Sequence, residues 1–235
     1  MDSAVSPYNK PLHKNKSVIH YILKDNQQSS LTSRCYKIKK MTVRNKIYYP
    51  DGVYFITFTC ARWLPLFTIT NGYQAVYNWF DYLTSQGHYI VGYVIMPHHV
   101  HAIIAFGNTG KTINAIIGNG KRFMAYYLVD LLKNQSNTEL LNQLAIMVNN
   151  TDKQNNKIHE VLEPSFDRKE CRTIEFIQQK LLYIHLNPCK SDPRLAVLPE
   201  YYIHSSAKYY YTGQQGVYSI TSYMDLQDID LESFR

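Results

Sequence analysis

Two apolar runs separated by a single proline stand near the middle of the chain: HYIVGYVIM (88–96) and HHVHAIIAF (98–106). Their β-branched and aromatic residues favour strands, and Pro97 interrupts the pattern between them, so we expect an antiparallel hairpin. The second run contains His99 and His101. Because residues two apart in a strand share a face, both imidazoles should point the same way while their apolar neighbours pack on the other side.

Further periodic patterns extend this hairpin into an α+β domain. The order of the patterns is strand, helix, strand, strand, helix, strand, helix, which predicts a ferredoxin-like antiparallel sheet with helices on one face plus an added helix. We expect Pro188 to end the last helix. Besides the hairpin, the pattern predicts strands at 53–60 and 158–166, helices at 71–87, 111–134 and 173–188, and a short helical patch at 140–147.

The charge of the chain is unevenly distributed. The net charge is +7, but residues 1–50 hold ten Lys and Arg against two acids, whereas residues 51–235 hold fifteen against sixteen. We therefore divide the chain into a basic extension (1–42), a folded domain (43–212) and an acidic tail (213–235). The extension would attract a polyanion such as nucleic acid, and a solubilising tail is the alternative.

Several classes of protein are disfavoured by the composition. The four cysteines are scattered without a CxxC pair, which argues against a zinc cluster and a disulfide framework. No apolar run approaches the length of about 20 residues that a membrane helix needs, and the first 30 residues lack the pattern of a signal peptide. We expect a cytoplasmic protein with no membrane contact.

The paired imidazoles of His99 and His101 are candidate metal ligands that need an oxygen donor from a neighbouring element. In the last predicted helix, Gln179, Tyr183 and Asn187 are spaced four apart and share one face, away from the apolar stripe. That face offers a phenol nucleophile and a carboxamide ligand together. The alternative is that the histidines cap the strand or satisfy backbone groups.

The motif MPHHVHAII, followed about 80 residues later by YIHLNP, resembles a known pair of motifs. The REP-associated tyrosine transposases, a group of single-tyrosine HUH endonucleases, have MPNHVHLL and YIHxNPV. The segments YFITFTCARWLPLF, SFDR and PEYYIHSSAKYY also resemble that family, so the likeness covers about residues 43–212. The chain departs from the pattern at His98, where Asn is usual, and at CKSDPRLA, which replaces VRAGLV.

The resemblance implies roles for four residues. His99, His101 and Asn187 would hold a divalent ion, Mg²⁺ or Mn²⁺, and Tyr183 would be the nucleophile. The implied enzyme is a tyrosine transposase and endonuclease that cuts and rejoins single-stranded DNA by transesterification through a 5′-phosphotyrosine intermediate. The resemblance also implies a hairpin-forming DNA substrate and, as is common in the family, a homodimer.

The candidate DNA-binding residues are Lys121, Arg122, Arg168 and Lys180, with tyrosines that could stack on unpaired bases. A solvated helix face is the alternative explanation for these charges. Two other functions remain open: a catalytically inactive nucleic-acid-binding protein of the same fold, and a metal-dependent phosphoesterase in which Tyr183 is structural. The residues alone do not identify the base that would take the phenol proton.

Overall fold

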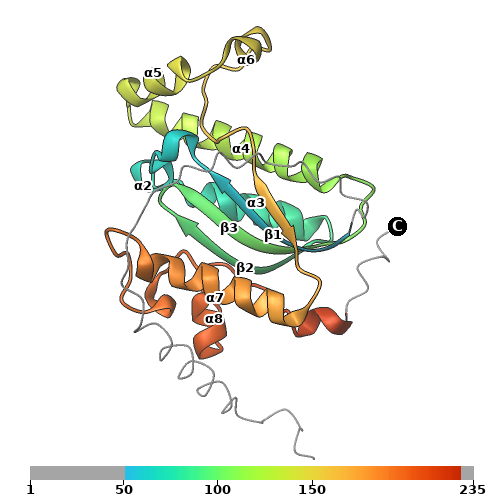
Figure 1. Cartoon of the computed structure of the whole chain (residues 1–235). Coiled ribbons are helices and arrows are strands. Elements are labelled where there is room, and N and C mark those ends of the chain that lie inside the picture. The colour runs from blue at the N-terminus through green and yellow to red at the C-terminus, as the bar shows by residue number, and fades with distance from the viewer. Residues whose placement is uncertain (1–50, 229–235) are drawn as a thin grey trace, which may run out of the picture. The chain divides into compact units, whose positions relative to one another are not determined.

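Four antiparallel strands form one sheet in the order β2-β3-β1-β4 (Figure 1). The computed structural model describes residues 51–228 of the chain. Strand order and direction are those of a ferredoxin-like α+β fold, which confirms the predicted fold class. The strands are β1 (Gly52–Thr59), β2 (Tyr89–Met96), β3 (His99–Phe106) and β4 (Asp167–Glu170).

Helices cover both faces of this sheet. No helix within residues 51–228 combines the length and apolar character needed to cross a bilayer. The three long helices fall where the sequence predicts them. Short helices at 66–69, 150–154 and 207–212 were not predicted. The helices are α2 (Leu66–Ile69), α3 (Gln74–Ser85), α4 (Ile113–Asn134), α5 (Thr138–Ile146), α6 (Asn150–Gln154), α7 (Ile174–Lys190) and α8 (Ala207–Thr212).

The alternation of side chains along the strands creates two hydrophobic cores. On β1, Ile56 and Phe58 face α3 and α4, whereas Phe55 faces α7. The larger core lies between the sheet and the pair α3 and α4, and the smaller core lies between the sheet and α7. The predicted arrangement, with helices together on one face plus an added helix, is therefore realised with the added helix α7 on the opposite face.

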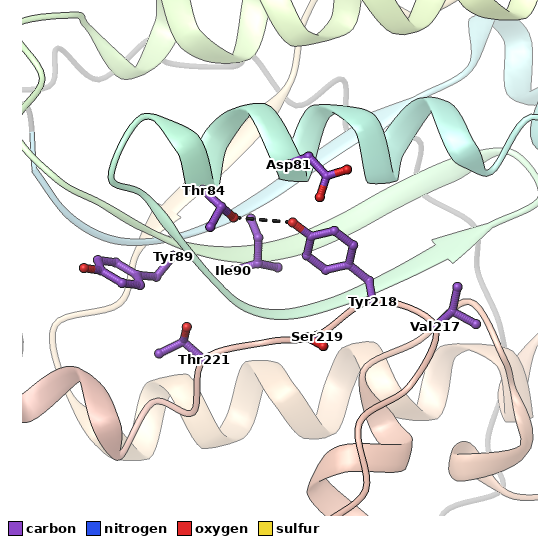
Figure 2. Close-up of a pocket in the computed structure, with 8 residues that line it drawn as sticks. All are labelled: Asp81, Thr84, Tyr89, Ile90, Val217, Tyr218, Ser219 and Thr221. Atoms are coloured by element: carbon purple, nitrogen blue, oxygen red, sulfur yellow. Dashed lines mark hydrogen bonds between the residues drawn. The ribbon is translucent and has the colours of Figure 1, made fainter.

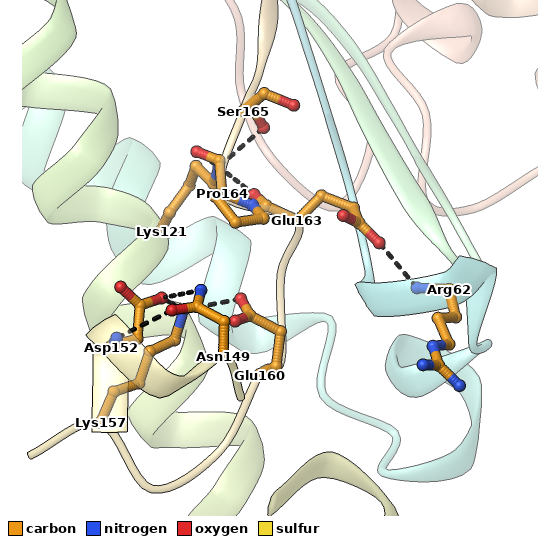
Figure 3. A network of polar contacts seen from close by, with 9 residues as sticks. All are labelled: Arg62, Lys121, Asn149, Asp152, Lys157, Glu160, Glu163, Pro164 and Ser165. Carbon is orange, nitrogen blue, oxygen red and sulfur yellow. Dashed lines mark hydrogen bonds and ion pairs between the residues drawn. The ribbon is translucent and has the colours of Figure 1, made fainter. Parts of the chain in front are cut away.

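The predicted strand at 158–166 is wrong, because β4 begins only at Asp167. Within 158–166, the structure has a single isolated bridge, between Leu162 and Cys60. The backbone carbonyls of residues 163–165 are instead bound by the ammonium group of Lys121 on α4, at 2.6, 3.1 and 2.9 Å (Figure 3). The true strand, DRKE, is a short charged edge strand, so it lacks the apolar pattern that marks a buried one.

Pro188 does not end α7, which continues to Lys190. A proline costs a helix one backbone donor, and here the residue falls in the last turns, where few such bonds remain to be made. The Pro188 carbonyl accepts hydrogen bonds from Leu195 N, at 2.9 Å, and from the Ser191 hydroxyl, at 3.0 Å. The chain after the helix is thereby folded back onto the helix end.

Part of the segment that the sequence divides off as an acidic tail is packed into the fold. Ile220 is buried in the larger core, and Thr221 N donates to Ile90 O at 2.9 Å. Tyr218 lies against α3, and a pocket lies between it, Asp81 and Tyr89 (Figure 2). The predicted basic extension and the final residues, 229–235, lie outside the described residues.

Replacing Lys121 with Met should destabilise the protein, because three carbonyl oxygens would lose their donor in a buried position. We expect the free energy of unfolding to fall by about 2–3 kcal/mol, measured by urea denaturation. Arg122→Met is the matched control, since Arg122 is the next residue and is exposed. An equal loss in both variants would contradict the role assigned to Lys121.

Candidate active site

Strand β3 presents His99 and His101 on the sheet face that α7 covers, whereas Val100 and Ala102 face the larger core. The predicted alternation is thus confirmed. The two imidazole ring centroids are 4.5 Å apart. His98 lies in the turn that precedes the strand, so it does not share the geometry of this pair.

Burial keeps both imidazoles uncharged. The side chains of His99 and His101 are only 7% and 6% exposed. Burial, with smaller contributions from His101 and His98, lowers the pKa of His99 to about 3. Burial and then the charge of Lys180 lower the pKa of His101 to about 4. At neutral pH both rings therefore have a nitrogen lone pair, which is the form that binds metals.

Hydrogen bonding distinguishes the ring nitrogens. Thr57 Oγ1 on β1 lies 2.7 Å from His101 Nδ1. When Nδ1 carries the proton and donates it to Thr57, Nε2 retains its lone pair for a cation, as in metal sites with supporting hydrogen bonds. His99 Nδ1 is buried and has no hydrogen-bond partner among the described residues. A buried polar atom without a partner is unfavourable unless a ligand satisfies it.

The donor set fits a divalent ion only in part. Two imidazoles supply nitrogen ligands, and the described residues contain no group of three His, Cys, Asp or Glu side chains placed so that all three could hold a metal ion. Asn187 lies one helical turn beyond Tyr183, and its Nδ2 donates to the Tyr183 carbonyl at 3.4 Å. Its carboxamide oxygen is the candidate third ligand, and that role stays a prediction.

Tyr183 lies beside the imidazole pair in the same chain. Its ring centroid is 5.3 Å from that of His101 and 6.1 Å from that of Phe55. The side chain is 50% exposed, so one edge contacts the buried rings while the rest faces solvent. The structure thus brings together two of the predicted metal ligands and the predicted nucleophile.

Close packing of α7 on β2 places Tyr183 there. A Cβ atom at Gly92 would lie 2.5 Å from a methyl group at the end of the Leu181 side chain, so a larger residue there would force that side chain to shift. Leu181 and Ile184, on either side of Tyr183, are buried against the sheet. Ile177 is buried too, whereas Ile174, the first residue of α7, is exposed.

His185, the histidine of YIHLNP, has a structural role. It is buried, and its Nε2 lies 2.9 Å from Ser206 Oγ. Ser206 Oγ in turn accepts a hydrogen bond from Tyr93 N at 2.9 Å. The three residues connect α7, the segment before α8 and strand β2, so they fix the rotation of α7 on the sheet.

Lys180 is the one predicted DNA-binding residue that lies with the imidazoles and Tyr183. Its ammonium nitrogen is 4.9, 5.1 and 5.6 Å from the ring centroids of Phe55, Phe176 and Tyr183. Burial lowers its pKa, and so does the neighbouring charge of Lys169. Lys169 of β4 pairs with Phe55 of β1, so Lys169 lies on the same face of the sheet as Phe55.

The other predicted DNA-binding residues belong to α4 and its face of the sheet. Lys121 is buried and its ammonium group binds three carbonyls, so it does not have the surface position that a contact with DNA requires. Arg168 pairs with Ile56, which faces α4, and Arg168 Nη1 donates to Asn114 Oδ1. Arg122 is exposed with its guanidinium over the Phe123 ring, at 5.3 Å. DNA contacts by Arg122 and Arg168 stay predictions.

Three residues near the imidazoles were missed by the sequence reasoning. Thr57 and Asp167 are neighbours across β1 and β4, and Thr57 also pairs with His101. Trp63 lies beside the histidines, with its ring centroid 5.0 Å from that of His98 and 5.7 Å from that of His99. Only the strand register and the turn after β1 bring these residues to the site, and neither has a local sequence signal.

Comparison with known proteins gives a likeness of fold. No family model and no curated protein matches the chain. A REP-associated tyrosine transposase, solved bound to a REP hairpin, matches with a TM-score of 0.50 and 15% identity, over 78% of this chain and 95% of that chain. A candidate transposase from Deinococcus radiodurans R1 gives a TM-score of 0.36 and 13% identity, over 60% and 95%. The first match shows that the chain has a transposase-like fold.

We expect the imidazoles of His99 and His101 to titrate near pH 3 and pH 4 in the metal-free protein, against about pH 6.5 in the unfolded chain. Between these pH values the two histidines bind protons in the unfolded chain but not in the folded chain. The free energy of unfolding should therefore fall as the pH drops from about 6.5 toward 4. Histidine NMR shifts followed against pH would measure both values. His99→Gln and His101→Gln should each lessen the fall, and midpoints near 6.5 in the folded protein would contradict the burial argument.

Proposed function

We propose that this protein is a metal-dependent single-stranded DNA endonuclease and transposase that cuts and rejoins DNA through a 5′-phosphotyrosine on Tyr183. The observation that carries the proposal is the contact between the Tyr183 and His101 rings, with centroids 5.3 Å apart, although the two residues come from α7 and β3. An exposed phenol beside buried, neutral imidazoles has the components for metal-assisted nucleophilic attack.

In this proposal His99, His101 and Asn187 hold Mg²⁺ or Mn²⁺. When bound, the ion would withdraw charge from a non-bridging oxygen of the scissile phosphate and orient the phosphorus for in-line attack. Two nitrogen ligands suit Mn²⁺ better than Mg²⁺. Thr57 would keep the His101 ring in the orientation and tautomer that expose Nε2.

Tyr183 would supply the oxygen that attacks phosphorus. A bond forms between this oxygen and phosphorus while the bond from phosphorus to the 3′ oxygen breaks. The phenol loses its proton and the 3′ oxygen gains one, which leaves a 5′-phosphotyrosine and a free 3′-hydroxyl. Because the new phosphodiester retains the energy of the old one, attack by a 3′-hydroxyl can rejoin the strand without ATP.

Lys180 would place positive charge next to the reacting phosphate. Lys180 lies one helical turn before Tyr183, and its ammonium group is held over the rings of Phe55, Phe176 and Tyr183. These aromatic contacts fix the position of the ammonium group without neutralising its charge. Such a fixed cation stabilises negative charge that develops on phosphate oxygens.

We propose hairpin-forming single-stranded DNA as the substrate, which the hairpin bound to the structurally similar transposase supports. The family resemblance also supports a homodimer. The pair of Tyr183 and His101 is formed within one chain, so a second subunit is not needed to complete it.

Tyr183→Phe should abolish covalent attachment to DNA while leaving the fold intact, because only the hydroxyl is removed from a half-exposed ring. Incubation with labelled single-stranded DNA and Mn²⁺, followed by denaturing electrophoresis, would detect the adduct. Tyr126→Phe, an exposed tyrosine on α4, is the control and should form adduct normally. Cleavage that persists in Tyr183→Phe would favour a phosphoesterase, and DNA binding without cleavage by the unaltered protein would favour a non-catalytic one.

His99→Ala and His101→Ala should each weaken Mn²⁺ binding by at least about tenfold, measured by electron paramagnetic resonance of free Mn²⁺. Thr57→Val should weaken binding by a similar factor because His101 loses its hydrogen bond, whereas Thr57→Ser retains the hydroxyl and should bind normally. His159→Ala, a partly exposed histidine before β4, is the control. Unchanged binding in both alanine variants, or full cleavage in excess chelator, would remove the metal from the proposal.

A further inference from the structure

The turn after β1 holds Arg62 and Trp63 in an unfavourable backbone conformation. Both have positive φ, 49° and 60°, which costs a residue with a side chain about 1 kcal/mol or more. The turn is held by Trp63 N, which donates to Cys60 O at 3.0 Å, and by Arg62 N, which donates to Glu163 Oε1 at 2.8 Å (Figure 3). The fold therefore keeps these two side chains at a defined place despite the strain.

That place is the edge of the candidate active site. Cys60 N donates to His98 O at 2.8 Å, which ties the turn to the start of β3. The Trp63 ring centroid lies 5.0 Å from that of His98, and the rings of His98 and His99 are 4.7 Å apart. Together with the contacts of His101 described above, these distances make a continuous row of rings from Trp63 to Tyr183.

The two ends of this row are exposed and its middle is buried. The indole of Trp63 is 62% exposed, although tryptophan is among the most apolar side chains, and Tyr183 at the other end is 50% exposed. The other tryptophan of the chain, Trp79, is 4% exposed in the core. Strained backbone conformations cluster at functional sites, and an exposed indole beside buried imidazoles offers a flat apolar face on which a ligand could pack.

We propose that Trp63, supported by His98, is a stacking platform for an unpaired nucleobase that flanks the scissile phosphate. The proposal rests on the proposed function, which puts a single DNA strand across the imidazoles and Tyr183. Every base has a flat aromatic face, so such a platform binds single strands with little dependence on sequence. Arg62, whose guanidinium is exposed in the same turn, would contact a phosphate of the same strand (Figure 3).

Tryptophan fluorescence tests the platform directly, because the chain has only two tryptophans and one of them is buried. The parent protein for this experiment is the full chain with Tyr183→Phe, which forms no covalent adduct. The parent and its Trp63 variants are each titrated with a mixed-sequence single-stranded oligodeoxynucleotide. We expect DNA to quench the emission, and the quenching to disappear with Trp63→Leu. Affinity should fall about tenfold with Trp63→Leu and less with Trp63→Phe, which keeps an aromatic face.

The salt dependence separates stacking from phosphate contact. Trp63→Leu should leave the slope of log affinity against log salt unchanged, whereas Arg62→Gln should reduce its magnitude by about 0.7, the value for one phosphate on a single strand. An oligodeoxynucleotide with one abasic position at the site of stacking should bind the parent less tightly and Trp63→Leu no differently.

Equal affinity and equal quenching in the parent and Trp63→Leu would overturn the platform. So would a change in oligomeric state with Trp63→Leu and no change in DNA affinity, because the indole would then contact another protein surface. If the unaltered protein still forms the covalent adduct in either case, only this inference fails. If the parent binds no single-stranded DNA and the unaltered protein forms no adduct, the proposed function fails with it.

Discussion

The site depends on how closely α7 packs against strand β2. At Gly92 the Leu181 side chain lies directly against the strand backbone. A Cβ atom at this position would be only 2.5 Å from a methyl group of Leu181. Because Leu181 and Ile184 are buried on either side of Tyr183, the tyrosine is placed at the margin of the interface, with one edge on the sheet and the other in solvent. A looser contact would move the Tyr183 phenol away from His101. The two residues are far apart in the sequence, so only the packing of α7 on the sheet brings them together.

The same packing determines the electrostatics. Covering β3 with α7 removes water from the imidazoles, and it is mainly this loss of water that keeps them neutral. It also leaves His99 Nδ1 buried without a partner among the described residues, at a cost of about 1–3 kcal/mol for such a group. Groups of this kind cluster at functional sites, where a ligand recovers the loss. The packing of α7 on the sheet therefore accounts both for the exposed phenol of Tyr183 and for the buried imidazoles.

Local periodicity predicted much of this arrangement. The alternation around His99 and His101, the hairpin and the three long helices all follow from residues within one element, and they are confirmed. The resemblance to tyrosine transposases further assigned Tyr183 to the site of the imidazole pair, and the structure brings its ring beside them. The predictions that the structure contradicts depend on partners far away in the sequence. The sequence predicts a surface charge at Lys121 because its three carbonyl acceptors lie some forty residues further on.

Three further differences from the sequence prediction have the same cause. The strand Asp167–Glu170 is recognised only through its pairing with β1, since a four-residue charged edge strand has no apolar pattern. Nothing in the sequence around Thr57 distinguishes it from other residues of β1. Only the strand register shows that it lies opposite His101. Trp63 reads in the sequence as one more apolar residue, and its exposure follows from a turn that is closed by Glu163, a hundred residues away.

An incomplete set of metal ligands has a consequence for how the proposed enzyme would work. If His99, His101 and Asn187 held the ion as proposed, two imidazoles and one carboxamide would leave coordination positions open, and a phosphate oxygen of the DNA strand could occupy one of them. A ligand shared in this way makes the affinities for DNA and for the ion depend on one another, by the same factor in each direction. The stacking of a base on Trp63 would then strengthen metal binding without touching the ion, because it holds the neighbouring phosphate over the imidazoles. Recognition of an unpaired base and assembly of the reactive centre would be one event, which would confine the chemistry to single-stranded DNA.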